Sequence, residues 1–67
     1  MNVLVNGEQK EIAEDAAVSD LITTLGLKPE RLAVELNRRV IRRAEWPSTR
    51  LREGDKVEIV HFVGGGA

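Results

Sequence analysis

The sequence contains no cysteine and few of the other residues that usually carry chemistry. Its 67 residues include one histidine, one tryptophan, one phenylalanine and no tyrosine. Without cysteine there can be no disulfide, no thiolate metal site and no thiol nucleophile. The lone histidine, His61, has no patterned carboxylates near it in sequence, which makes it a poor candidate for catalysis or metal binding. We therefore expect no catalytic residue, no bound cofactor and no metal site.

Long hydrophobic runs and an excess of charge of one sign are also missing. No apolar run approaches the roughly 20 residues that cross a bilayer, and no signal peptide is recognisable. Ten basic and eleven acidic residues give a net charge of -1, whereas nucleic-acid-binding domains are usually basic. These absences predict a cytoplasmic single-domain protein with neither nucleic acid nor membrane as a partner.

The beginning of the chain has the pattern of a β-hairpin. Residues 1–5 are apolar and β-branched, Asn6-Gly7 follows, and residues 8–12 are mostly polar. Asn-Gly between strand-like runs is a strong hairpin signal, because both positions tolerate a positive φ. Alternation along the first strand puts its odd-numbered residues on one face and Leu4 on the other.

One amphipathic helix follows. Apolar residues recur at the spacing i, i+3, i+4 and i+7 in Val18, Leu21, Ile22 and Leu25. Gly26 suits the position after the helix, since glycine enters the left-handed conformation without a Cβ penalty. Pro29 makes continuation of the helix beyond that point unfavourable.

The second half of the chain predicts more strands. Residues 32–37 alternate, residues 40–41 form a short return strand, and residues 56–62 form the last strand. We expect residues 43–51 to be irregular, because Pro47 lacks the N–H that a strand needs.

The order β-β-α-β-β with a final β predicts an α+β fold. The terminal strands are the most apolar and are placed side by side at the centre of the sheet. This arrangement is a ubiquitin-like β-grasp, with a mixed sheet of about four to five strands packed on one helix.

The glycines Gly64, Gly65 and Gly66 divide the chain into a domain over residues 1–62 and a flexible C-terminal tail over residues 63–67. Consecutive glycines contribute nothing to a core and lose much entropy on ordering. One interpretation is a frayed end. The other is an arm that enters a narrow channel in another protein, because glycine allows a partner's backbone to approach closely.

Apolar residues on the outward face of the last strand suggest a docking surface. Alternation directs Val60 and Phe62 outward, where Leu4 also points, and Val63 follows them toward the tail. The alternative is that the strand twists or bulges and buries these side chains.

Three segments together resemble the thiamine-biosynthesis sulfur carrier family, bacterial relatives of ubiquitin. These are residues 3–7, residues 33–37 and, most specifically, residues 54–66. The small subunit of molybdopterin synthase shares the fold and a Gly-Gly end, but it is usually longer and has a proline before its glycines.

The resemblance implies that the reacting residue is the family's last glycine, which is Gly66 here. In the family, an adenylyltransferase related to ubiquitin-activating enzymes uses ATP and magnesium to adenylate this carboxylate. Sulfur from a persulfide donor displaces AMP and leaves a thiocarboxylate, which donates its sulfur at thiazole synthase. The carrier is thus a co-substrate and not an enzyme, and we expect it to be monomeric when free.

The chain departs from the family at its last residue. The family typically ends at the glycine, whereas Ala67 follows Gly66 here. We expect Ala67 to be removed before activation; a residue added in cloning is the other explanation.

Two other functions fit the same residues. One is a related carrier that serves molybdopterin or another sulfur pathway. The other is a non-covalent ubiquitin-like interaction module whose glycines are only a disordered end.

Overall fold

A computed structural model describes residues 1–62, which form a five-stranded mixed sheet with the order β2-β1-β5-β3-β4. The strands are β1 (Asn2–Val5), β2 (Glu8–Glu11), β3 (Leu32–Leu36), β4 (Arg39–Ile41) and β5 (Lys56–His61). Strands β1 and β5 are parallel, and the other neighbouring strands are antiparallel. The predicted pairing of the two terminal strands is therefore confirmed, with β5 at the centre. The predicted tail, residues 63–67, lies outside the described residues.

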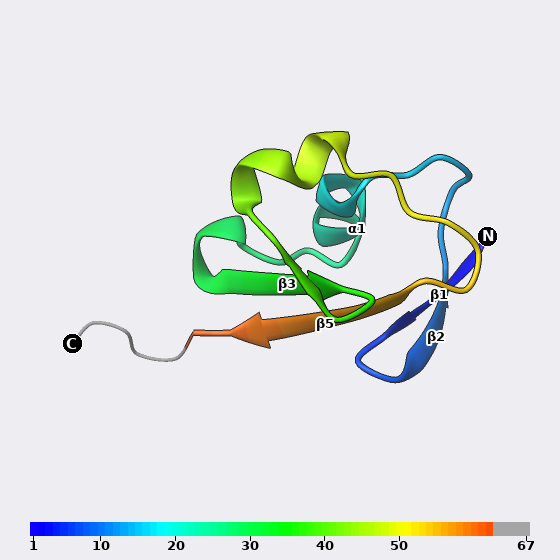
Figure 1. The fold of residues 1–67 in the computed structure, drawn as a ribbon, viewed down its shortest axis with the longest axis horizontal. Coiled ribbons are helices and arrows are strands. Elements are labelled where there is room, and N and C mark those ends of the chain that lie inside the picture. Colours follow the sequence, from blue (N-terminus) through cyan, green and yellow to red (C-terminus); the bar gives the residue numbers. More distant parts are fainter. Residues whose placement is uncertain (63–67) are drawn as a thin grey trace.

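The helices lie on one face of this sheet (Figure 1). They are α1 (Val18–Thr24) and the 3₁₀ helices η1 (Pro29–Arg31) and η2 (Arg43–Ser48). Figure 1 shows η2 beside α1, on the same side of the sheet. The helices thus bury one face of the sheet and leave the opposite face to solvent.

The end of α1 follows directly from Gly26. This residue has a φ of 72°, which glycine adopts without strain. Its N–H donates to the Thr23 carbonyl at 3.0 Å, and the Leu27 N–H donates to the Ile22 carbonyl at 3.2 Å. These two bonds are a Schellman motif, which satisfies carbonyls that the last turn leaves unpaired. The predicted helix end is confirmed.

The core lies between α1, η2 and the sheet. The predicted helical stripe is buried at Val18, Leu21 and Ile22, while Leu25 is half-buried. Alternation in the strands supplies the other side of the core, as predicted. The buried core residues are Val3, Val5, Val18, Leu21, Ile22, Leu32, Val34, Ile41, Trp46, Leu51, Val57 and Ile59.

The prediction of an irregular segment over residues 43–51 was wrong in part, because residues Arg43–Ser48 form η2. Pro47 excludes a strand there but is compatible with this tight turn of helix. Trp46 is only 3% exposed, and its indole N–H donates to the Ile41 carbonyl at 2.9 Å. Burial of the one tryptophan therefore stabilises a segment whose local pattern shows no regular element.

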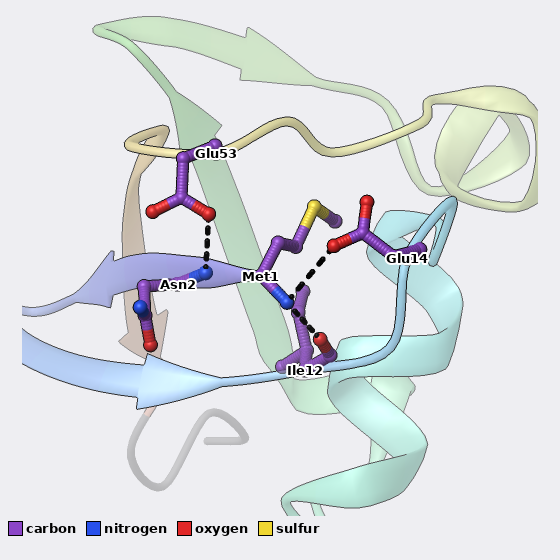
Figure 2. Close-up of polar contacts among 5 residues, drawn as sticks. All are labelled: Met1, Asn2, Ile12, Glu14 and Glu53. Carbon is purple, nitrogen blue, oxygen red and sulfur yellow. Dashed lines mark hydrogen bonds and ion pairs between the residues drawn. The ribbon is translucent and has the colours of Figure 1, made fainter.

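The first two residues of the chain connect the start of β1 to two loops by polar contacts (Figure 2). The α-ammonium group of Met1 donates to the Ile12 carbonyl at 2.8 Å and forms an ion pair with Glu14 at 3.3 Å. On the other side of the strand, the N–H of Asn2 donates to a carboxylate oxygen of Glu53 at 2.9 Å. These contacts hold the start of β1 against the loop before α1 and the loop before β5.

Candidate functional site

The candidate site lies on the face of the sheet that the helices leave uncovered. The large apolar side chains exposed among residues 1–62 are Val40, Val60 and Phe62, at 70%, 53% and 55%. Val60 and Phe62 are thus exposed, as their alternation with buried Val57 and Ile59 predicts. They come from the last part of the chain that the structure describes, next to the predicted tail.

The strand register places these residues on the same face of β5 and β4, with β3 between them. Val60 lies opposite Ala33, and Val40 lies opposite Glu35. The N–H of Phe62 donates to the Arg31 carbonyl at 2.9 Å. The pairing of β5 with the β3 side therefore continues to Phe62 and fixes its main chain.

Val40 is a member of this surface that the sequence analysis missed. Its neighbour Ile41 is buried at 6% exposure, while Val40 is the most exposed of the large apolar side chains. The signal was present in the sequence, because alternation from an inward Ile41 directs Val40 outward. Val40 lies beyond β3, opposite Glu35, and is therefore apart from Val60 and Phe62. We refer to Val60 and Phe62 as the apolar patch.

Leu4 lies on the same face but apart from the apolar patch. It is half-buried and opposite Lys56 in the parallel pairing of β1 and β5. At a strand rise of about 3.3 Å per residue, this position is about 13 Å along β5 from Val60. Leu4 instead lines a shallow hollow with Asn2, Val3, Gln9, Glu53 and Gly54.

Two carboxylates lie on the same face, on the neighbouring strands β3 and β5. Glu35 and Glu58 are directly opposite each other in the pairing of β3 and β5. Within residues 1–62 neither forms an ion pair, and like charges directly opposite destabilise a sheet. Lys56 lies two residues from Glu58 on the same face of β5, so the face combines apolar side chains with charges of both signs.

Asn6 fixes the part of β5 that precedes the apolar patch. Its side-chain oxygen accepts the N–H of Ile59 at 2.7 Å, and its side-chain amide donates to the Ile59 carbonyl at 3.3 Å. Asn6 has a φ of 51° and Gly7 a φ of 85°, so both adopt the turn conformation that the hairpin prediction requires. The sequence analysis used Asn6 only as a turn signal and missed this contact, because the partner is distant in sequence.

The remaining predicted site residues are Val63, Gly64, Gly65 and Gly66, and all four lie outside the described residues. The structure therefore shows where the chain leaves the sheet, next to Phe62. The end of β5 points away from the N-terminus in the plane of Figure 1.

Residues 1–62 contain no group of three or more His, Asp or Glu side chains arranged to hold a metal ion. A surface hollow of about 650 Å³ lies between the loop after β2 and α1. It is open and separate from the apolar patch. In this part of the chain, no helix has the length and apolar character needed to span a bilayer.

Comparison with known proteins identifies the relatives of this chain. The family model described as the ThiS family matches residues 3–66. Over 63 residues the chain is 33% identical to the sulfur carrier protein ThiS of Bacillus subtilis, covering 92% of this chain and 96% of that protein.

Two further relatives are longer. The chain is 38% identical over 66 residues to a thiazole synthase of Magnetococcus marinus, covering 98% of this chain and 20% of that protein. A thiazole synthase of Paramagnetospirillum magneticum is 33% identical over 67 residues, covering 100% of this chain and 21% of that protein. The chain thus spans about a fifth of the length of these curated relatives.

The fold is also that of a solved structure. The crystal structure of the thiamine biosynthesis protein ThiS from Geobacter metallireducens matches with a TM-score of 0.85 and 38% identity, covering 98% of this chain and 100% of that one. This agreement confirms the predicted ubiquitin-like β-grasp fold.

Proposed function

The chain belongs to the ThiS family, and on that premise we propose that it is a sulfur carrier for thiamine biosynthesis that reacts at the carboxyl group of Gly66. The observation that carries this proposal is the family match over residues 3–66, which includes the glycines 64–66. A relative of similar length named as a sulfur carrier protein supports the same function.

The proposed reaction follows from the chemistry of a carboxylate, which is a poor electrophile. An adenylyltransferase related to ubiquitin-activating enzymes binds ATP and magnesium. The Gly66 carboxylate attacks the α-phosphorus of ATP, pyrophosphate leaves, and an acyl-adenylate forms. The terminal sulfur of a persulfide then attacks the carbonyl carbon and expels AMP. A thiol reductant cleaves the remaining S–S bond and leaves the thiocarboxylate.

Thiazole synthase is the proposed acceptor of this sulfur. Two relatives that bear this name include a region similar to 98% and 100% of this chain. In this proposal the carrier contributes a reactive terminus and a docking surface, and its partners contribute the catalytic groups. We place these reactions in the cytoplasm and expect the free carrier to be a monomer.

The proposed docking surface consists of Leu4, Val60, Phe62 and Val63. The exposure of Val60 and Phe62, at 53% and 55%, supports their part in it. Such side chains contribute most to binding when a partner removes them fully from water. The distance of Leu4 from this pair suggests that it contacts a different part of the partner.

The glycines Gly64, Gly65 and Gly66 suit a reacting arm. A glycine has no Cβ, so a channel that excludes water can close tightly around its backbone. If Ala67 remained, the terminal carboxyl group would lie one residue beyond the proposed reacting position at Gly66. The alanine would also add a Cβ to the arm. The proposal therefore includes removal of Ala67 before adenylation.

A reconstituted reaction tests this function. The chain ending at Gly66 and the chain with Ala67 are each incubated with the adenylyltransferase, ATP, magnesium and a persulfide donor, and the products are followed by intact-mass spectrometry. We expect exchange of one carboxyl oxygen for sulfur only on the chain that ends at Gly66.

Three outcomes would contradict parts of this proposal. Formation of no adenylate on either chain would favour a non-covalent interaction module. Sulfur on a terminus that still bears Ala67 would contradict the removal step. Sulfur transfer to a molybdopterin precursor and not to thiazole synthase would assign the carrier to the other pathway.

A further inference from the structure

The main-chain groups of β5 point alternately toward its two neighbours, and the hydrogen bonds show which residues point where. On the β3 side, the Asn37 N–H donates to the Lys56 carbonyl at 2.8 Å, and the Phe62 N–H donates to the Arg31 carbonyl at 2.9 Å. Even-numbered residues of β5 therefore direct their N–H and C=O groups toward β3.

Odd-numbered residues direct theirs toward β1. The Asn6 N–H donates to the Val57 carbonyl at 2.9 Å, and the Ile59 N–H donates to the side-chain oxygen of Asn6 at 2.7 Å. By the same alternation, the N–H and C=O of His61 point to the β1 side of β5.

Strand β1 ends before it can reach His61. It stops at Val5, and the turn at Asn6 and Gly7 reverses the chain. The side chain of Asn6 forms the last hydrogen bonds on the β1 side of β5, with the main chain of Ile59. Among residues 1–62, no group forms a hydrogen bond with the main-chain N–H or C=O of His61, and His61 is exposed.

An open edge of this kind is a template for another strand. A peptide that pairs with it gains main-chain hydrogen bonds, while adjacent side-chain contacts provide specificity. Here the neighbours of His61 are Val60 and Phe62, which are 53% and 55% exposed. The edge and the apolar patch therefore lie together at the point where the chain leaves the sheet.

We propose that an extended main-chain segment of thiazole synthase pairs with β5 at His61, in the place that a longer β1 would fill. The segment donates one N–H to the His61 carbonyl and accepts the His61 N–H, while its apolar side chains cover Val60 and Phe62. This inference rests on the proposed function. It names thiazole synthase because relatives of that name carry a region like this chain within one polypeptide.

Proline substitution tests the pairing, because proline removes a single main-chain N–H. His61→Pro removes an N–H that has no partner among residues 1–62, so the variant folds. Sulfur transfer to thiazole synthase falls by about tenfold or more, as loss of a hydrogen bond and a steric clash predict. Formation of the thiocarboxylate by the adenylyltransferase stays within about twofold of the unsubstituted chain.

Two matched proline variants show whether the effect of His61→Pro depends on the direction in which the lost N–H points. Glu11→Pro acts on β2, the outer strand beyond β1, where the odd-numbered residues of β1 pair with even-numbered residues of β2. Its N–H also points outward, so both folding and transfer persist. Val60→Pro removes an N–H that points to Ala33, so this variant loses the fold.

A synthetic carrier with an ester in place of the amide before His61 provides the same test without a proline ring. His61→Ala, which keeps the main-chain N–H, must lose less transfer than His61→Pro. In the complex with thiazole synthase, hydrogen exchange at the His61 amide slows by about tenfold or more, as expected when a main-chain N–H gains a partner.

Transfer by His61→Pro and the ester analogue at the rate of the unsubstituted chain would overturn the proposal. Slower adenylation with unchanged transfer would also overturn it, because the edge would then serve the adenylyltransferase. If the unsubstituted chain forms a thiocarboxylate but donates nothing to thiazole synthase, the proposed acceptor fails. If the unsubstituted chain forms no thiocarboxylate, the proposed function fails. The proposed pairing at His61 fails in either of these two cases.

Discussion

Arg38 adopts a left-handed backbone conformation that arginine rarely takes. It has a φ of 73°, next to Asn37 at 50°, in the turn between β3 and β4. Two-residue hairpin turns of this kind require a positive φ at both positions, and glycine is strongly preferred at the second. The Asn6-Gly7 turn follows that preference, whereas the Asn37-Arg38 turn does not. Arg38 therefore contributes local strain of about 1–2 kcal/mol.

Substitution of Arg38 by glycine should relieve this strain. We expect Arg38→Gly to raise the free energy of unfolding by about 0.5–1 kcal/mol, because added flexibility of the unfolded chain offsets part of the gain. Urea denaturation measures the change. Gly7→Ala, at a φ of 85°, is the control and should lower stability by about 1 kcal/mol. A less stable Arg38→Gly variant would show that the arginine side chain makes a compensating contact.

Trp46 shows how a single buried residue stabilises an irregular segment. Its side chain fills the core beside α1 and its indole N–H bonds to the Ile41 carbonyl. Trp46→Phe keeps most of the apolar area but removes this donor. We expect a loss of about 1–3 kcal/mol, measured by thermal unfolding followed by circular dichroism. A loss below about 0.5 kcal/mol would mean that the hydrogen bond contributes little.

At the scale of elements, two asparagines attach the hairpins to the central strand. Asn6 bonds to both main-chain groups of Ile59. Asn37 accepts the Lys56 N–H at 3.0 Å and donates to Asp55 at 3.1 Å. Both have a positive φ, so each side chain extends the pairing of its strand by one position at the point where the main chain turns away.

Asn6→Gly separates this attachment from the turn itself. Glycine tolerates the φ of 51°, so the variant loses only the two bonds to Ile59. We expect a loss of about 1–2 kcal/mol and faster hydrogen exchange at the Ile59 amide. Asn37→Gly is the matched control, with the exchange at Ile59 unchanged. Equal effects of both variants on Ile59 would indicate general weakening of the sheet.

For the whole molecule, the core and the proposed docking surface lie on opposite faces of one sheet. The helix side carries the core, and the open side carries the apolar patch and the pair of Glu35 and Glu58. A domain of this size buries only about 60% of its unfolded surface. Large apolar side chains that stay exposed therefore reduce the area that could be buried in the core. Their retention on the open face is what a binding surface requires.

Lysine substitutions on the open face should separate binding from folding. We expect Val60→Lys with Phe62→Lys to keep stability within about 0.5 kcal/mol, since both side chains are more than half exposed. Formation of the thiocarboxylate, sulfur transfer, or both should fall by about tenfold or more. Thr23→Lys, on the exposed side of α1, is the control and should change neither. Full activity of the double variant would remove this surface from the proposed function.

The sequence by itself determined the elements whose signals are local. The turn at Asn6-Gly7, the stripe of Val18, Leu21 and Ile22, and the helix end at Gly26 depend on residues a few positions apart, so spacing and φ preference were sufficient. The outward direction of Val60 followed in the same way, because alternation in a strand has a fixed period.

Only the tertiary structure decided the features that join distant residues. The bonds of Asn6 to Ile59, the pairing of Glu35 with Glu58 and the burial of Trp46 against the core connect parts of the chain whose separation depends on the register. The open main-chain edge at His61 is of this kind, because it exists only where β1 ends beside a longer β5. Sequence periodicity gives the direction of a side chain, but the end of a neighbouring strand decides which main-chain groups remain available to a partner.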